Sequence, residues 1–89
     1  MIVGKKVCYS GRVQGVGFRF TACRVAESFA VAGYVKNLPN GQVELFAEGE
    51  VEVVDAFLAA VAGALREYIT QSSVENQVSR NLRGFQIRH

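Results

Sequence analysis

The sequence predicts an α+β domain in which two helices lie on one face of a four- to five-stranded antiparallel sheet. Three observations favour this class: two segments have helical apolar spacing, two alternating segments joined by a turn lie between them, and an alternating segment stands near each end. The chain has 89 residues, 49% of them hydrophobic, and contains one proline. This length and composition predict a single packed domain over residues 1–89.

The first two elements follow from a change in the spacing of the apolar residues. Residues 5–10 alternate, with Val7 and Tyr9 on one face, which is typical of a strand with one buried side. From Arg19 onward the apolar residues recur at helical intervals, and we expect Gly33 to stop this helix. The apolar stripe of the helix consists of Ala22, Val25, Ala26 and Phe29.

A hairpin is predicted after the first helix. Residues 34–38 and 42–48 form two extended runs, and Pro39, Asn40 and Gly41 between them are a strong turn signal, because Asn and Gly tolerate positive φ. In the second run apolar and polar side chains alternate, so we expect a strand with one buried face. That face consists of Val43, Leu45 and Ala47.

The second half of the chain contains one clear helix and a short last strand. Residues 51–65 show helical apolar spacing, and Phe85 and Ile87 share one face of a strand within residues 84–89. Residues 68–78 are polar and weakly patterned, so they allow a fifth strand without fixing its register. The apolar stripe of the second helix consists of Val54, Phe57, Leu58, Val61 and Leu65.

The order of these elements corresponds to a split βαβ arrangement, the ferredoxin-like βαββαβ sandwich. In this arrangement one set of strand side chains faces the helices. The set consists of Val7, Tyr9, Val35, Val43 and Leu45. Cys8 then faces away from the layer that carries Cys23, so we expect two free thiols rather than a disulfide.

Charge and hydropathy exclude several classes of partner. The formal net charge is +2 and the Lys and Arg residues are not clustered, so we expect an anionic small ligand rather than a nucleic acid. No segment approaches the roughly 20 apolar residues of a membrane span, and no apolar region follows the first lysines as in a signal peptide. We therefore expect a cytoplasmic protein without membrane contacts. Its expected oligomeric state is a monomer.

Residues 11–19 read G-R-V-Q-G-V-G-F-R and lie between the first strand and the first helix. A glycine-rich turn allows consecutive backbone N–H groups to point inward, and the helix that follows adds free N–H groups of its own. Arg19 falls in the first helical turn, where its guanidinium can bind a phosphate through two hydrogen bonds. Spacing alone leaves a second interpretation open, in which the glycines only turn the chain and the arginines are solvated.

Asn37 is predicted to lie beside this loop. The first and second strands of a split βαβ sheet end at the same edge, and Asn37 stands near the end of the second strand. Asn37 lies two residues after Val35 in the same strand, so its side chain points to the same face of the sheet, toward the helices. Its amide offers a donor and an acceptor, which suits holding a water molecule against a bound phosphate. The alternative is that Asn37 is only a turn residue.

Residues 11–19, together with G-Y-V-K-N-L-P-N-G-Q-V-E at 33–44, resemble the two signatures of the acylphosphatase family. The resemblance implies hydrolysis of acyl phosphates without a metal or cofactor. It implies that Asn37 orients the attacking water, that Arg12 has a supporting role, and that Arg19 and the backbone N–H groups of the loop bind the phosphate. The implied phosphate-binding residues are Gln14, Gly15, Val16, Gly17, Phe18 and Arg19.

Two other functions compete with this one. The same fold can serve as a non-catalytic module that binds phosphate or carbamoyl phosphate in larger proteins. An RNA-binding sheet has the same order of elements. It needs aromatic side chains exposed on the open face of the sheet and a motif of the type R-G-F-G-F-V that supplies them. Phe46 is the clearest outward aromatic residue of the sequence and the motif is absent, so the RNA-binding function is disfavoured.

Overall fold

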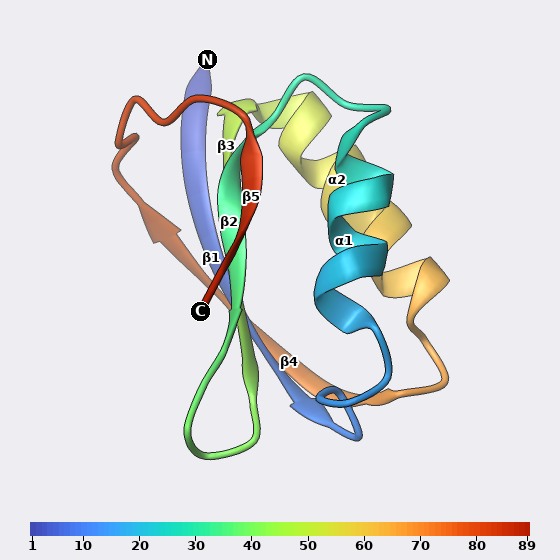
Figure 1. Ribbon diagram of the computed structural model, residues 1–89. Coiled ribbons are helices and arrows are strands. Elements are labelled where there is room, and N and C mark those ends of the chain that lie inside the picture. Colours follow the sequence, from blue (N-terminus) through green and yellow to red (C-terminus); the bar gives the residue numbers. More distant parts are fainter.

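The computed structural model describes residues 1–89 and contains a five-stranded sheet with both helices on one face, as Figure 1 shows. This confirms the predicted α+β class and the order of its elements. The elements are β1 (Ile2–Gly11), α1 (Phe18–Ala26), β2 (Ala32–Asn37), β3 (Val43–Glu50), α2 (Val51–Ala64), β4 (Ile69–Gln77) and β5 (Phe85–Arg88). No helix combines the length and the apolar character that crossing a bilayer requires.

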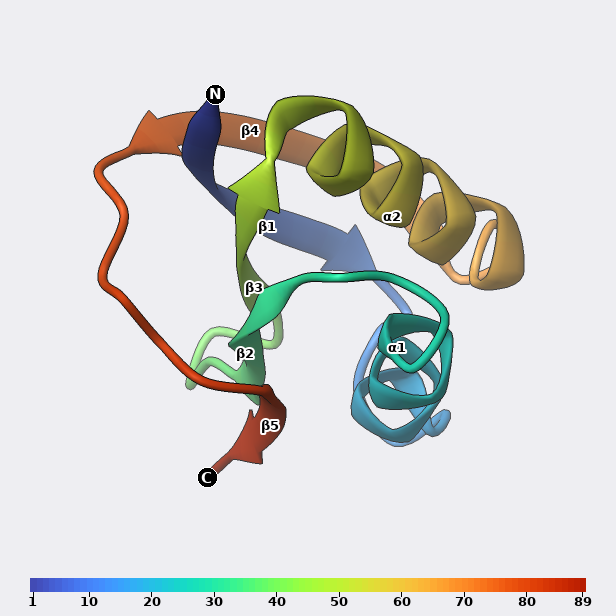
Figure 2. The ribbon, with the colours of Figure 1, turned by 90° about the horizontal axis from the view of Figure 1, so that it is seen from above.

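The sheet is mixed, whereas the sequence predicted an antiparallel one. The strand order is β4-β1-β3-β2-β5, and every neighbouring pair is antiparallel except β2 and β5, which are parallel. The reason is the path of the chain after β4. Residues 78–84, which we call the crossover segment, carry the chain from one edge of the sheet to the other on the face opposite the helices (Figure 2). β5 then runs beside β2 in the same direction.

The core lies between the sheet and the two helices, and the predicted side-chain parity is confirmed. Val7 of β1 and Val35 of β2 both pair with Leu45 of β3, so the apolar side chains of the three central strands meet in one layer. The stripe of α2 packs on this layer, as apolar burial requires. The strand residues of the core include Val7, Tyr9, Val35, Val43 and Leu45, and those of α2 include Val54, Phe57 and Val61.

The first helix ends earlier than the sequence predicted. α1 stops at Ala26, and the next two residues form a tighter turn in which the N–H of Ser28 donates to the carbonyl of Val25. Gly33 is not a helix stop but a residue of β2. A Cβ at this position would lie 1.8 Å from the carbonyl oxygen of Phe46, so only glycine allows the two strands to approach this closely.

The face of the sheet opposite the helices is also partly buried, which the sequence did not predict. Phe46 points to this face but is fully buried, because Tyr34 stacks beside it and the guanidinium of Arg80 lies 4.1 Å from its ring centre. Glu48 is 5% exposed and its carboxylate accepts hydrogen bonds from the crossover segment. The expectation that β3 has a single buried face is therefore wrong, and Phe46 is not available to stack on a nucleic-acid base.

The polar segment after α2 forms the edge strand β4. It pairs with β1 from Gly4–Gln77 to Gly11–Ile69, although nearly all of its side chains are exposed. Both cysteines are free, as the sequence predicted. Cys23 packs against the core from α1, and partial burial together with the nearby carboxylate of Glu27 raises the pKa of its thiol. Such a thiol is a poor nucleophile near neutral pH.

Candidate active site

The loop between β1 and α1 has the conformation that its glycines allow. Gly15 and Gly17 have φ angles of +79° and +78°, in the left-handed region that L-residues rarely adopt. Gly17 also precedes the first residue of α1, where no side chain caps the helix and no acidic residue stands in the first turn. The positive end of the helix dipole therefore faces the solvent beside the loop.

The backbone of this loop keeps its hydrogen-bond donors free. None of the N–H groups of residues 13–17 donates a hydrogen bond within the protein, and the first helical bond is donated by Thr21 to the carbonyl of Gly17. Val13 and Phe18 are buried at the two ends of the loop and anchor it to the core. A row of free donors held by buried anchors has the form of an anion-binding nest.

Arg19 follows at the start of α1, and its charge is not neutralised by a carboxylate. The ion pairs of the structure are formed by other residues. One guanidinium nitrogen lies 3.4 Å from the carbonyl oxygen of Arg88 and 3.5 Å from the Nδ1 atom of His89. Both contacts are at the long limit of a hydrogen bond, so the guanidinium is held near β5 while keeping most of its donors free.

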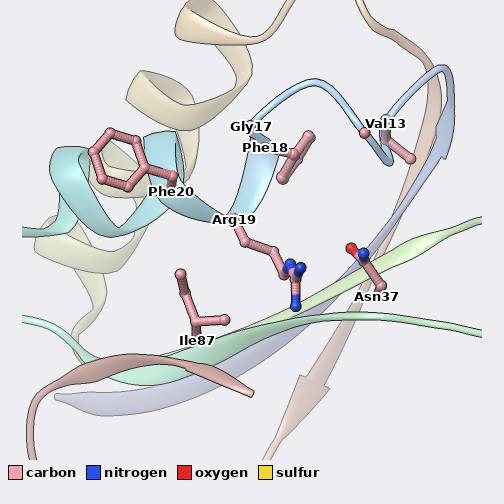
Figure 3. Close-up of a pocket in the computed structure, with 8 residues that line it drawn as sticks. Val13, Gly17, Phe18, Arg19, Phe20, Asn37 and Ile87 are labelled. Carbon is pink, nitrogen blue, oxygen red and sulfur yellow. The ribbon is translucent and has the colours of Figure 1, made fainter. Parts of the chain in front are cut away.

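Arg19 and Asn37 line one pocket with the loop. The pocket has a volume of about 190 Å³ and is lined by Val13, Gly15, Gly17, Phe18, Arg19, Phe20, Asn37 and Ile87. Figure 3 shows the guanidinium of Arg19 and the amide of Asn37 turned toward one another below the loop. Pockets for drug-sized ligands usually measure about 300–1,000 Å³, so this one suits a smaller group such as a phosphate. The predicted neighbourhood of Asn37 and the loop is confirmed.

The structure gives Gln14 a role that the sequence did not reveal. Its side-chain amide donates to the carbonyl oxygens of Leu38 and Gln42, both at 2.8 Å. These carbonyls belong to the hairpin turn directly after Asn37, so Gln14 fastens the loop to the hairpin. The amide of Gln42 in turn donates to the hydroxyl of Ser10 at 2.8 Å. The bonded carbonyls carry no side-chain signal that a sequence could display.

An apolar wall completes the pocket. Phe20 stands in the first turn of α1 and Ile87 stands in β5, and in Figure 3 both lie on the side of Arg19 away from Asn37. Ile87 was predicted to face inward, but neither residue was assigned to the site. Arg12, which the sequence placed in a supporting role, lies outside the set of residues that line this pocket. Its guanidinium lies over the ring of Tyr68, 5.5 Å from the ring centre.

The pocket lacks the groups that usually perform covalent or metal-assisted hydrolysis. No Ser, Cys or carboxylate side chain lines it. No three His, Cys, Asp or Glu side chains lie close enough together to hold a metal ion. What the pocket offers is a set of fixed hydrogen-bond donors and one unpaired positive charge, which suits a group with several anionic oxygens.

Comparisons with known proteins agree with this chemistry. The family model that matches the chain is described as Acylphosphatase and covers residues 5–87. An acylphosphatase from Archaeoglobus fulgidus is 48% identical over 60 residues, which are 67% of this chain and 67% of that protein. An acylphosphatase from Thermotoga petrophila is 40% identical over 85 residues, which are 94% of each chain.

A solved structure extends the similarity over the whole fold. The crystal structure of an acylphosphatase from Bacillus subtilis matches this chain with a TM-score of 0.87 and 33% sequence identity, covering 100% of both chains. The match therefore includes β4, β5 and the crossover segment, which the sequence motifs do not reach.

Proposed function

The chain belongs to the acylphosphatase family, and we infer that it hydrolyses the carboxyl–phosphate bond of acyl phosphates to a carboxylate and inorganic phosphate. One observation carries this proposal beyond the family name. A loop of free N–H groups, an unpaired guanidinium and a side-chain amide line the same small pocket. Residues 1–89 form the single domain that we propose to hold the whole activity.

We propose that the phosphate group is bound by Arg19 and by the backbone N–H groups of residues 14–18. The planar guanidinium matches two phosphate oxygens, and the N–H groups of the loop and of the first helical turn surround the others. Because these donors are fixed before the substrate binds, they need little reorganisation when charge moves during phosphoryl transfer.

Asn37 is proposed to orient the attacking water. Its amide accepts a hydrogen bond from the water through oxygen and donates to a phosphate oxygen through nitrogen. A new bond forms between the water oxygen and phosphorus, the bond from phosphorus to the carboxylate oxygen breaks, and the water proton passes to a phosphate oxygen of the substrate. No side chain has to act as a base in this step, because a phosphate oxygen of the substrate takes the proton. None has to act as an acid, because the carboxylate is already a good leaving group.

The same chemistry explains why no cofactor is proposed. The donors of the pocket already supply the positive field that phosphoryl transfer requires, so we propose a metal-independent hydrolase. Its proposed partner is a small acyl phosphate, with no nucleic acid and no membrane. We also propose that it acts in the cytoplasm as a monomer.

The decisive experiment is steady-state hydrolysis of benzoyl phosphate with EDTA present, comparing the wild type with Asn37→Ala. We expect the wild type to turn over rapidly. Loss of one aligned donor costs about a hundred- to a thousandfold in rate, so Asn37→Ala lowers kcat by that factor, with a smaller effect on inhibition by inorganic phosphate. Asn76→Ala, in the exposed edge strand β4, is the matched control and keeps the wild-type rate.

Three outcomes would contradict parts of the proposal. Near-normal turnover of Asn37→Ala would remove this residue from the mechanism. Activity that is lost in EDTA and restored by a divalent cation would contradict the metal-independent chemistry. Binding of inorganic phosphate without any turnover would mean that the pocket belongs to a non-catalytic binding module.

A further inference from the structure

Phe20 occupies an unusual position for a large apolar side chain. It is 61% exposed, yet it lines the pocket that holds Arg19. The guanidinium of Arg24, one turn further along α1, lies 5.7 Å from the centre of its ring and restricts where the ring can move. In Figure 3 the ring lies at the edge of the pocket and is directed away from the Arg19 guanidinium, and it keeps apolar surface open to the solvent.

The direction of the reaction gives this surface a role. In phosphoryl transfer the attacking and leaving oxygens lie roughly in line on opposite sides of phosphorus. If the water is held by Asn37 and the phosphate by Arg19, the leaving carboxylate lies on the side of the phosphate away from Asn37. Phe20 and Ile87 lie on that side of Arg19, as Figure 3 shows.

We propose that Phe20 and Ile87 form the subsite that binds the acyl group, and that this subsite favours acyl phosphates with an apolar, flat acyl chain. The inference rests on the proposed function, since it uses the position of the attacking water. Ile87 supplies an aliphatic side wall from β5, and the ring of Phe20 supplies a surface on which an aromatic or unsaturated acyl group can pack.

The same geometry explains why a very small acyl group gains little from the subsite. A methyl group next to the carboxyl carbon stays close to the phosphate and contacts little of the Phe20 ring. A benzoyl group extends toward the ring and removes apolar surface of both partners from water. The subsite therefore discriminates between substrates by the size of the acyl group and leaves the binding of phosphate to Arg19 and the loop.

The test compares benzoyl phosphate with acetyl phosphate in the wild type, Phe20→Ala and Phe20→Leu. An apolar contact of this kind discriminates about 10- to 200-fold, and the open position of Phe20 favours the lower end. We therefore expect Phe20→Ala to lower the ratio of kcat/KM for benzoyl over acetyl phosphate about tenfold, mainly through KM for benzoyl phosphate. Phe20→Leu restores part of the ratio.

Controls separate this result from a general effect on the enzyme. Val74→Ala removes another exposed apolar side chain, on the edge strand β4, and leaves the ratio unchanged. The inhibition constant of inorganic phosphate, which lacks an acyl group, changes far less in Phe20→Ala than KM for benzoyl phosphate does. Because the Phe20 side chain is largely exposed, its truncation leaves the folded state intact.

The outcomes also separate this inference from the proposed function. If the wild type hydrolyses both substrates and Phe20→Ala lowers both values of kcat/KM equally, or neither, the subsite is overturned while the proposed function stands. If the wild type hydrolyses neither substrate, the proposed function and the subsite fall together.

Discussion

The guanidinium of Arg19 carries a charge that no carboxylate of the protein neutralises. A residue of this kind is costly for a fold unless a ligand completes it, because an arginine held close to free N–H groups raises the local positive potential. Its shape matters as much as its charge. The planar, fork-shaped guanidinium presents five donors in one plane, whereas a lysine presents a point charge that cannot match two phosphate oxygens together.

We therefore expect Arg19→Ala to lower kcat/KM for benzoyl phosphate about a thousandfold or more, mainly through lost phosphate binding, and Arg19→Lys to restore little of it. The measurement is kcat/KM together with the inhibition constant of inorganic phosphate. Arg83→Ala, in the exposed crossover segment, is the matched control for the loss of a positive charge. A lysine variant with wild-type phosphate affinity would show that charge alone suffices and that the fork is not needed.

Between elements, the site depends on how the loop is joined to the hairpin that carries Asn37. Gln14 makes this connection through two hydrogen bonds of 2.8 Å to backbone carbonyls. The phosphate-binding groups lie on the loop and on α1, whereas the group proposed to hold the water lies on β2. The distance between phosphate and water is therefore set by the contact between the two segments, and the side chain of Gln14 is a positioning group rather than a catalytic one.

Removal of the Gln14 side chain should lower kcat more than it lowers the affinity for inorganic phosphate. Each hydrogen bond contributes about 0.5–1.5 kcal/mol, so we expect Gln14→Ala to lower kcat about tenfold, with a smaller change in the inhibition constant of inorganic phosphate. Gln14→Glu should be worse than the alanine variant, because a carboxylate would face two carbonyl oxygens. Gln71→Ala, on β4, is the control. Equal losses of kcat and phosphate affinity would mean that Gln14 only supports the folding of the loop.

The elements also show what the sequence could reveal and what it could not. Arg19, Asn37 and the glycine loop were predictable, because contiguous residues form the loop and strand parity places Asn37 beside it. The pairing register of β4 with β1 could not be predicted, because backbone hydrogen bonds hold this strand and its side chains show almost no apolar pattern. The burial of Phe46 was missed for a related reason: its cover is Arg80, which arrives only after the chain has crossed the sheet.

For the molecule as a whole, the two faces of the sheet have different tasks. Both helices cover one face of the sheet (Figure 1), and this face holds the core and ends in the proposed active site. The opposite face is crossed by residues 78–84, which Glu48 fastens to the sheet. Its carboxylate accepts hydrogen bonds from the backbone N–H groups of Arg80 and Leu82, both at 2.6 Å, and from the hydroxyl of Ser79 at 3.1 Å. These bonds compensate the cost of burying a carboxylate.

This division predicts that stability and activity can be changed separately. Hydrogen bonds to a charged group contribute about 1.5–3 kcal/mol each, and the freed donors regain water, so we expect Glu48→Ala to lower the free energy of unfolding by about 3 kcal/mol. Glu48→Gln should lose less, because its amide oxygen still accepts one of the three donors. The measurement is urea unfolding, with kcat/KM for benzoyl phosphate determined well below the midpoint.

The activity of both variants should stay near the wild-type value, because β5 keeps its own pairing with β2 from Gly33–Phe85 to Lys36–Arg88. Ile87 and the carbonyl of Arg88 thus stay beside Arg19 even when the crossover segment is loosened. Glu75→Ala, an exposed carboxylate on β4, is the control for the loss of a negative charge. A Glu48 variant that is folded and as stable as the wild type but inactive would show that the back face of the sheet controls the pocket, contrary to this division.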